Sequence, residues 1–384
     1  TIYRSRSANC SHQIQVLRHR DHGNPHNTIY SIIRTGDNQI YVGTYNGLCR
    51  YIASNGKFEK IPLPVNSSQS NLFVNSLLED TGRQCIWIGT EGYLFQYFPS
   101  TGQMKQTEAF HNNSIKSLAL DGNGYLLAGT DNGLYVYHND VTPLQHIIHD
   151  SRNIQSLTNN IIWNIFADQE HNIWLGTDYG ISLSRYNSAL QFIPISQITG
   201  TGDGNQFYSL FRDSKGFYWF GGTNGLIRFT DPAGDKHNAI WYRMGDKTYP
   251  LSHNRIRHIY EDKEQQLWIA TDGSINRYDY ATRQFVHYNI VDSTGTYNTN
   301  WTYYMFEDNA GRLWISTCLG GIFVVDKHRL MQSASGQYVA EQNYSVHNGL
   351  SGMFINQIIP DNEGNVWVLL YNNKGIDKIN PRTR

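Results

Sequence analysis

The chain has 384 residues, of which 39% are hydrophobic, 13% aromatic and only 16% charged. This apolar content excludes a disordered chain, and the abundance of Gly and Tyr is typical of many short strands joined by tight turns. The formal net charge of −1 gives no global electrostatic reason to expect a nucleic acid as partner.

The chain opens on TIYRSRSANC, without the basic start and apolar stretch of a secretory signal peptide. The chain contains no run of about 18 apolar residues, which a membrane-spanning helix would need. We therefore expect neither a signal nor a transmembrane segment in this sequence. The next segment, HQIQVLRHR (12–20), resembles the last strand of a β-sheet whose earlier strands are missing.

One segment then recurs in eight variants. In chain order they are IYVGTYNGLCRY (40–51), IWIGTEGYLFQY (86–97), LLAGTDNGLYVY (126–137), IWLGTDYGISLS (173–184), YWFGGTNGLIRF (218–229), LWIATDGSINRY (267–278), LWISTCLGGIFV (313–324) and VWVLLYNNKGID (366–377). An anchor residue precedes each copy and lies six positions before a turn residue, as Ile162 does before Asp168. The anchors are Ile29, Val74, Ile115, Ile162, Phe207, Ile256, Thr302 and Ile355, spaced by 41 to 53 residues. Such a period indicates a solenoid, a propeller or another array.

Residues 160–195 show how one repeat reads. Four segments of this repeat are rich in β-branched and aromatic residues and are separated by turn residues, which predicts four strands, A to D. They are NIIWNIFAD (160–168), IWLGT (173–177), ISLSRY (181–186) and LQFIPI (190–195). Four antiparallel strands in about 40 to 50 residues make one propeller blade. No helical stripe is present, and a parallel β-helix, which needs shorter rungs, is the weaker alternative.

The eighth unit (341–384) leaves the number of blades open. The opening strand at 12–20 could complete it and close the ring, which predicts an all-β, eight-bladed propeller over residues 1–384. Alternatively, the wider spacing of 53 residues and the degraded VWVLLYNNKG sequence indicate seven blades followed by the start of a neighbouring domain.

Propeller geometry places the D–A connections and B–C turns on one face, where irregular loops usually carry recognition. Strand A residues next to these loops mix aromatic rings with Arg and Lys, a combination that suits a sugar ring. Arg255, Arg257 and Lys116 could also hold carboxylate or sulfate groups. Alternatively, the aromatic residues pack between blades and the charged ones line a wet channel. The candidate ligand-binding residues are Tyr30, Lys116, Trp163, Tyr208, Arg255, Arg257, Trp301 and Tyr303.

Catalytic and metal motifs are weak by comparison. No Ser/His/Asp or Cys/His arrangement is evident, and the loop acids Asp150, Asp203, Asp246 and Asp292 are the ones that a propeller enzyme could use. The cysteines are scattered without C-x-x-C spacing, so we expect no disulfide-dense scaffold, no metal site and no cofactor.

The consensus N-x-I-x-x-I-x-x-D-x-x-G-x-[IL]-W-[IL]-G-T-x-x-G-[IL]-x-R-Y resembles the two-component regulator propeller repeat over essentially all of residues 13–380. Departures include Ala128, Gly222, Ala270 and Ser316. The resemblance implies the periplasmic sensor region of a Bacteroides-type hybrid two-component system, which is not itself an enzyme. It also implies an adjacent propeller, a Tyr-rich β-sandwich, a homodimeric parent histidine kinase, and oligosaccharide ligands that control polysaccharide-utilisation genes.

Two other functions stay open at the level of sequence. One is a secreted propeller glycosidase or lyase that acts on polysaccharide. The other is a scaffold that binds no small ligand and mediates dimer or domain contacts. The repeat pattern favours the sensor and the scaffold over the enzyme.

Overall fold

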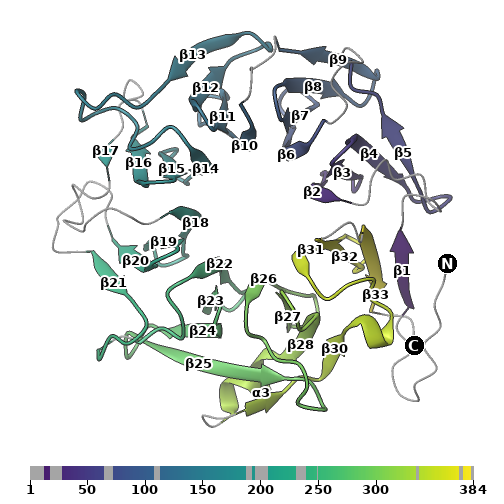
Figure 1. Ribbon diagram of the computed structural model, residues 1–384, viewed down its shortest axis with the longest axis vertical. Helices are drawn as coiled ribbons and strands as arrows, with labels where there is room; N and C mark the ends of the chain where they lie inside the picture. The colour runs from purple at the N-terminus through teal and green to yellow at the C-terminus, as the bar shows by residue number, and fades with distance from the viewer. Residues whose placement is uncertain are drawn as a thin grey trace. The chain divides into compact units, whose positions relative to one another are not determined.

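The computed structural model describes residues 13–17, 28–64, 72–107, 113–186, 193–194, 206–230, 239–248, 250–333, 337–371 and 375–381. Its strands form eight small sheets, one per repeat (Figure 1). The prediction of an all-β, eight-bladed propeller is therefore confirmed. By its internal contacts the chain divides into two compact units. The first comprises the described residues of Tyr30–Tyr51 and Lys60–Ile240, and the second comprises β1, Thr28, Ile29, Ile52–Glu59 and the described residues from Trp241 onward.

In the first four blades the strands are hydrogen-bonded in chain order, as labelled in Figure 1. Blade one contains β2 (Ile29–Arg34), β3 (Ile40–Thr44), β4 (Gly47–Ile52) and β5 (Lys57–Ile61). Blade two contains β6 (Val74–Asp80), β7 (Cys85–Thr90), β8 (Leu94–Phe98) and β9 (Gln103–Gln106). Blade three contains β10 (Ile115–Leu120), β11 (Leu126–Thr130), β12 (Gly133–Tyr137) and β13 (Pro143–Ile147). Blade four contains β14 (Ile162–Ala167), β15 (Ile173–Thr177), β16 (Gly180–Ser184) and β17 (Ile193–Pro194).

The later blades begin in the same way. Blade five contains β18 (Phe207–Arg212), β19 (Tyr218–Gly222), β20 (Gly225–Phe229) and β21 (Ile240–Tyr242). Blade six contains β22 (Ile256–Glu261), β23 (Leu267–Thr271), β24 (Ser274–Asp279) and β25 (Gln284–Val291). Blade seven contains β26 (Thr302–Glu307), β27 (Arg312–Thr317), β28 (Ile322–Asp326) and β30 (Gln342–Tyr344), and blade eight contains β31 (Ile355–Pro360), β32 (Val366–Leu370) and β33 (Ile376–Asn380).

The fourth strand of blade eight comes from the other end of the sequence. Strand β1 (Gln13–Leu17) pairs antiparallel with β33, in a register that sets Gln13 opposite Asn380 and Leu17 opposite Ile376. Figure 1 shows β1 beside β33 near the two chain ends. The last repeat thus forms a complete four-stranded sheet, so eight blades form and the seven-blade alternative is wrong.

An insertion explains the wide spacing before the last anchor. Between β28 and β30 the chain forms the short helix α3 (Lys327–Gln332) and β29 (Gln337–Val339), which pairs parallel to β25 as a fifth strand of blade six. A one-turn 3-10 helix, η2 (Val346–Asn348), follows β30. The extra residues therefore belong to blades six and seven and do not start a new domain.

A repeated side-chain bond explains why the repeat contains both Asp and Trp. In six blades the turn aspartate after strand A accepts a hydrogen bond from the indole Nε1 of the buried Trp of strand B, over 2.7–3.0 Å. Blade one has Thr35 and Tyr41 at the two positions, and blade three has Leu127 instead of Trp. Since a buried indole N–H without a partner is costly, the aspartate stabilises the buried Trp in each of these six blades.

Packing explains the glycine of the Gly-Thr pair in strand B, and the B–C turn explains the threonine. A Cβ on Gly89 would lie 2.6 Å from Ile115 of the next blade, and one on Gly176 would lie 2.3 Å from the Phe207 carbonyl oxygen. Glycine therefore lets neighbouring sheets of the first unit approach closely. The threonine that follows binds the B–C turn, as Thr177 Oγ1 does when it donates to the Gly180 carbonyl at 2.8 Å.

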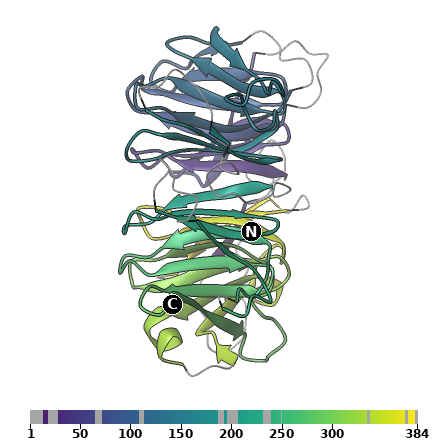
Figure 2. The ribbon, with the colours of Figure 1, turned by 90° about the vertical axis from the view of Figure 1, so that its left-hand side faces the viewer.

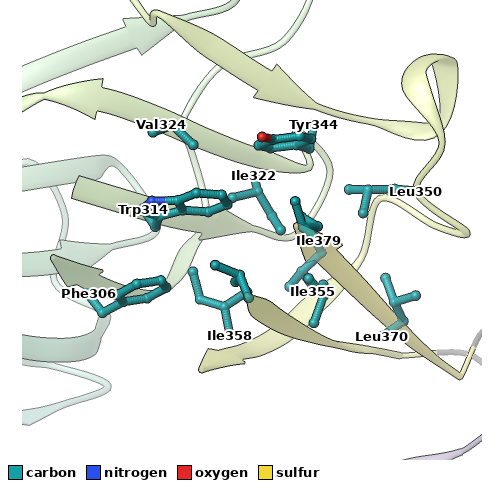
Figure 3. Packing of buried hydrophobic residues seen from close by; sticks show 12 residues of the cluster. Phe306, Trp314, Ile322, Val324, Tyr344, Leu350, Ile355, Ile358, Leu370 and Ile379 are labelled. Carbon is teal, nitrogen blue, oxygen red and sulfur yellow. The ribbon is translucent and has the colours of Figure 1, made fainter. Parts of the chain in front are cut away.

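The core lies between the faces of successive sheets. Figure 2 shows the purple to teal sheets of the first unit stacked face to face, and β10 contacts both β6 and β14. In the second unit, Figure 3 shows Trp314 of β27 between Phe306 and Tyr344, with ring centroids 5.9 and 5.5 Å away. Ile355 and Ile358 of the next blade complete this cluster.

A buried charge cluster anchors α3. Lys327 Nζ lies 3.0 Å from Glu307 and 3.3 Å from Asp262, and all three side chains are almost fully buried. Burial alone would lower the pKa of Lys327, but pairing with the two carboxylates outweighs burial and raises the pKa.

In the part of the chain that the structure describes, no helix is long and apolar enough to cross a bilayer.

Candidate functional site

At one end of seven blades the start of strand A lies next to the B–C turn. In these blades the first residue after strand B donates its N–H to the carbonyl of the residue before strand A of the same blade. The bonds from Asp178 to Ile161 (2.9 Å) and from Asp272 to Arg255 (3.3 Å) are examples. The described residues that end the D–A connections therefore lie beside the B–C turns, as the propeller interpretation predicts.

The second residue of strand A lies in a β-bulge in seven blades. In blade four, Ile162 pairs with Thr177 and Asn164 with Gly176, so Trp163 has no partner in the register. A bulge re-aims the side chain of the extra residue and is common beside functional sites. The bulged residues are Asn75, Lys116, Trp163, Tyr208, Arg257, Tyr303 and Asn356.

Lys116 and Trp163 meet in the first unit. The Lys116 ammonium lies 4.4 Å above the centre of the Trp163 ring and 2.9 Å from a carboxylate oxygen of Asp131. The Trp163 indole Nε1 donates to Asp178 at 3.0 Å, and that side chain remains 41% exposed. The charge of Lys116 is therefore already balanced, and the Trp163 side chain is held in place while it remains partly exposed.

The other predicted residues of the first unit lie in similar surroundings. Tyr208 is half-buried, and its carbonyl accepts a hydrogen bond from Asn164 at 3.1 Å. Tyr30 is exposed and packs edge-on against Phe73, with ring centroids 5.7 Å apart. Burial raises the pKa of the Tyr30 hydroxyl, with smaller contributions from Tyr45 and Glu91, so this hydroxyl is neutral at physiological pH.

Two arginines share one carboxylate in the second unit. Arg257 donates to both oxygens of Asp272, at 2.7 and 3.2 Å, and its guanidinium lies 4.5 Å above the Tyr303 ring. Arg255 is 46% exposed, and its Nε lies 3.9 Å from Asp272. Burial also raises the pKa of Tyr303. Arg257 is thus fixed by its bidentate pair, and Arg255 is the more accessible cation.

Trp301 opens onto a pocket of about 320 Å³ in the second unit. Its indole is 48% exposed. The pocket is lined by Thr296, Tyr297, Asn298, Asn300, Trp301, Leu319 and Gly320.

The backbone of Trp301 is held in an uncommon conformation. Its φ of 54° lies in the left-handed region, which is unfavourable for a bulky residue. The Trp301 N–H donates to the Asp272 carbonyl and its carbonyl accepts from Cys318, both at 3.0 Å. Hydrogen bonds to the B–C turns of blades six and seven thus fix the backbone from which the indole projects, and strain of this kind is typical of functional sites.

The opposite end of blades one and two has a larger cavity of about 570 Å³. It lies where Thr35 and Tyr41 stand in place of the Asp and Trp of other blades. Its carboxylates are engaged, since Glu79 accepts from the Gly36 N–H at 2.9 Å and Asp80 accepts from Trp87 at 3.0 Å. The sequence-based predictions did not include this cavity, although Thr35 and Tyr41 depart from the repeat pattern at this place.

The loop acids considered for catalysis act as turn caps. Asp150 accepts from the Arg152 backbone at 3.0 Å, Asp246 from Thr248 at 2.7 Å, and Asp292 from Tyr297 at 2.7 Å. Asp203 lies outside the described residues. Among the residues that are described, no group of three or more His, Cys, Asp or Glu side chains is placed to hold a metal ion.

Comparison with known families and structures identifies the repeat. The model of the family described as "Two component regulator propeller" matches residues 23–46, 156–179, 201–224 and 250–273. The chain contains two-component regulator propeller repeats. Each match includes the D–A connection and the W-[IL]-G-T-like strand B of one blade, so the repeats in blades one, four, five and six carry the family pattern.

Sensor proteins are among the relatives of this two-component regulator propeller. The chain is 92% identical to the extracellular domain of a B. thetaiotaomicron protein described as a one-component or hybrid two-component system, over 96% of this chain and 50% of that one, with a TM-score of 0.50. It is 26% identical to histidine kinase P4 of Formosa agariphila over 72% of this chain and 21% of that protein. A second B. thetaiotaomicron hybrid two-component system, 18% identical, has an extracellular domain that covers 96% of this chain with a TM-score of 0.61 and shares the fold.

The chain spans about half of the extracellular domain that it matches at 92% identity and about a fifth of the histidine kinase. None of these comparisons assigns a ligand residue. The candidate residues read from the sequence therefore stay predictions, to which the structure adds the bulge and the Trp301 pocket.

Proposed function

We propose that this chain is the ligand-sensing propeller of an extracytoplasmic, periplasmic sensor in a hybrid two-component regulator. Its ligand is an oligosaccharide released from a glycan, and its output is transcription of polysaccharide-utilisation genes. The 92% identity to an extracellular domain of such a protein supports the class of receptor. The observation that carries the ligand class is the pocket beside the exposed Trp301 indole in the second unit.

Signalling in this proposal is conformational. The parent protein is a homodimer that adds a second propeller and a Tyr-rich β-sandwich to this chain. A sugar that binds one arrangement of these parts more tightly shifts the equilibrium by its differential affinity for the two states. This chain needs no catalytic residue for that role, which agrees with loop acids that serve as turn caps.

Titration calorimetry with a panel of oligosaccharides from plant and host glycans tests the proposal. We expect saturable binding of at least one member and no cleavage of it on prolonged incubation. Failure of every member to bind a folded protein would favour the scaffold function. Release of new reducing ends would favour an enzyme instead.

A further inference from the structure

We propose that the Trp301 pocket binds one neutral sugar residue of the oligosaccharide. The inference rests on the proposed function and names both the subsite and the ligand class. None of the seven residues that line the pocket carries a charge. A carboxylate or sulfate bound there would lose water without gaining a cation, which is unfavourable.

The chemistry of the lining suits a ring of hydroxyl groups. The exposed indole of Trp301 offers a flat apolar surface for the C–H face of a sugar. Asn298 and Asn300 are both exposed, and within the described chain neither amide NH₂ group has a protein partner. Each amide can therefore donate to a hydroxyl group of the sugar.

The lining is also pre-organised. The Asn298 side-chain oxygen accepts from the Asn300 N–H at 3.0 Å, and the Tyr297 hydroxyl is bonded to His347 at 3.0 Å. The carboxylate of Asp292 holds the start of this loop through the Tyr297 N–H. Fixing these groups before binding lowers the entropy lost when a ligand is captured.

The size of the pocket limits the occupant. Its volume of about 320 Å³ is at the small end of the range for small-molecule sites, roughly 300–1,000 Å³. One sugar residue fits, and the rest of an oligosaccharide extends outside. The two nearby arginines, Arg255 and Arg257, are not among the residues that line the pocket. Arg257 is paired with Asp272, and the Arg255 Nε lies 3.9 Å from the same carboxylate.

The decisive experiment measures affinity by calorimetry with matched neutral and acidic probes. Oligosaccharides of galactose are compared with oligosaccharides of galacturonic acid of equal linkage and length, and the same is done with glucose and glucuronic acid. We expect a neutral member to bind at least about tenfold more tightly than its uronate counterpart. Equal or tighter binding of the uronate, lost in Arg255→Gln, would overturn the neutral class.

Variants locate the subsite. Trp301→Ala should weaken binding by at least about tenfold, and Asn300→Ala by a few fold. Tyr186→Ala, at an exposed aromatic residue of the first unit outside the candidate site, is the control and should leave the affinity unchanged. Gly320→Ala adds a Cβ 2.5 Å from the Asn298 carbonyl oxygen and should also weaken binding, without touching the indole. If oligosaccharides bind and neither Trp301→Ala nor Gly320→Ala changes the affinity, the pocket proposal is wrong while the sensor function stands. Absence of any binder overturns both.

Discussion

Two tryptophans of blade four make the same bond and have different roles. Trp174 donates its indole N–H to Asp168 at 2.8 Å, and Trp163 donates to Asp178 at 3.0 Å. Trp174 is completely buried and its equivalent recurs in most blades, whereas Trp163 is 41% exposed and occupies a position that is filled by five different residue types among the eight repeats. The difference shows that burial, more than bond type, decides which residues the repeat keeps. The two ends of the blade are therefore under different constraints, and mutations should separate them.

The largest effect on stability is expected at the buried end of blade six, where Lys327 of α3 pairs with the turn aspartate Asp262. Lys327→Met leaves Asp262 and Glu307 buried without their shared cation, and we expect a loss of about 3–5 kcal/mol in the free energy of unfolding. Denaturant titration measures this. Lys263→Met, at an exposed lysine, is the control and should cost under about 0.5 kcal/mol. Equal effects would contradict the importance of the buried cluster.

A smaller effect is expected from the two indole N–H groups compared above. Trp174→Phe leaves the Asp168 carboxylate without one buried donor, and we expect a loss of about 1–3 kcal/mol. Trp163→Phe removes an exposed bond and should cost under about 0.5 kcal/mol. Both values come from urea unfolding of the same preparation. A larger loss of unfolding free energy in Trp163→Phe than in Trp174→Phe would contradict the proposed difference between the two ends of the blade.

Backbone strain at the variable end gives a third test. Trp301→Ala and Trp301→Gly remove the same indole, but only glycine tolerates a φ of 54° without steric cost. We expect the glycine variant to be about 1 kcal/mol more stable than the alanine variant. Thermal unfolding of the pair reports the difference. A more stable alanine variant would mean that residue 301 is not strained.

The smallest effect concerns acid pH. Burial opposes ionisation of Asp292, but hydrogen bonds from Thr294 and from the Tyr297 N–H outweigh it and hold the pKa of this carboxyl below its usual value. Its contribution to stability is therefore full above the unfolded pKa of about 3.9 and is lost as the pH falls through the folded value. Melting temperatures of the protein and of Asp292→Asn should converge slightly between about pH 5 and pH 2. Parallel curves would contradict this assignment.

Much of the scaffold is predictable because its signals are local. Strand B of blade four was expected at 173–177 and is found at Ile173–Thr177, since a short β-branched run between turn residues needs no distant partner to be recognised. Strand C was expected at 181–186 and is found at Gly180–Ser184. The position after each anchor could also be named as variable from the repeat alone.

The remaining features depend on distant contacts. The bulge at Trp163 arises from the register between two strands, which no single segment specifies. Helix α3 is too short for a helical pattern and depends on Asp326, which caps it, and on the buried partners of Lys327. The Trp301 pocket requires residues 296–301 and 319–320 to meet. Only Trp301 among its lining residues was a sequence-based candidate.

The pairing of β1 with β33 has a consequence for synthesis of the protein. During translation at roughly 5–20 residues per second, β1 emerges on the order of tens of seconds before its partner. Until then its backbone N–H and C=O groups lack their partner strand, and an unpaired strand edge is a template for association with other chains. The strand that completes blade eight is thus also a segment that a nascent chain must keep apart from its neighbours.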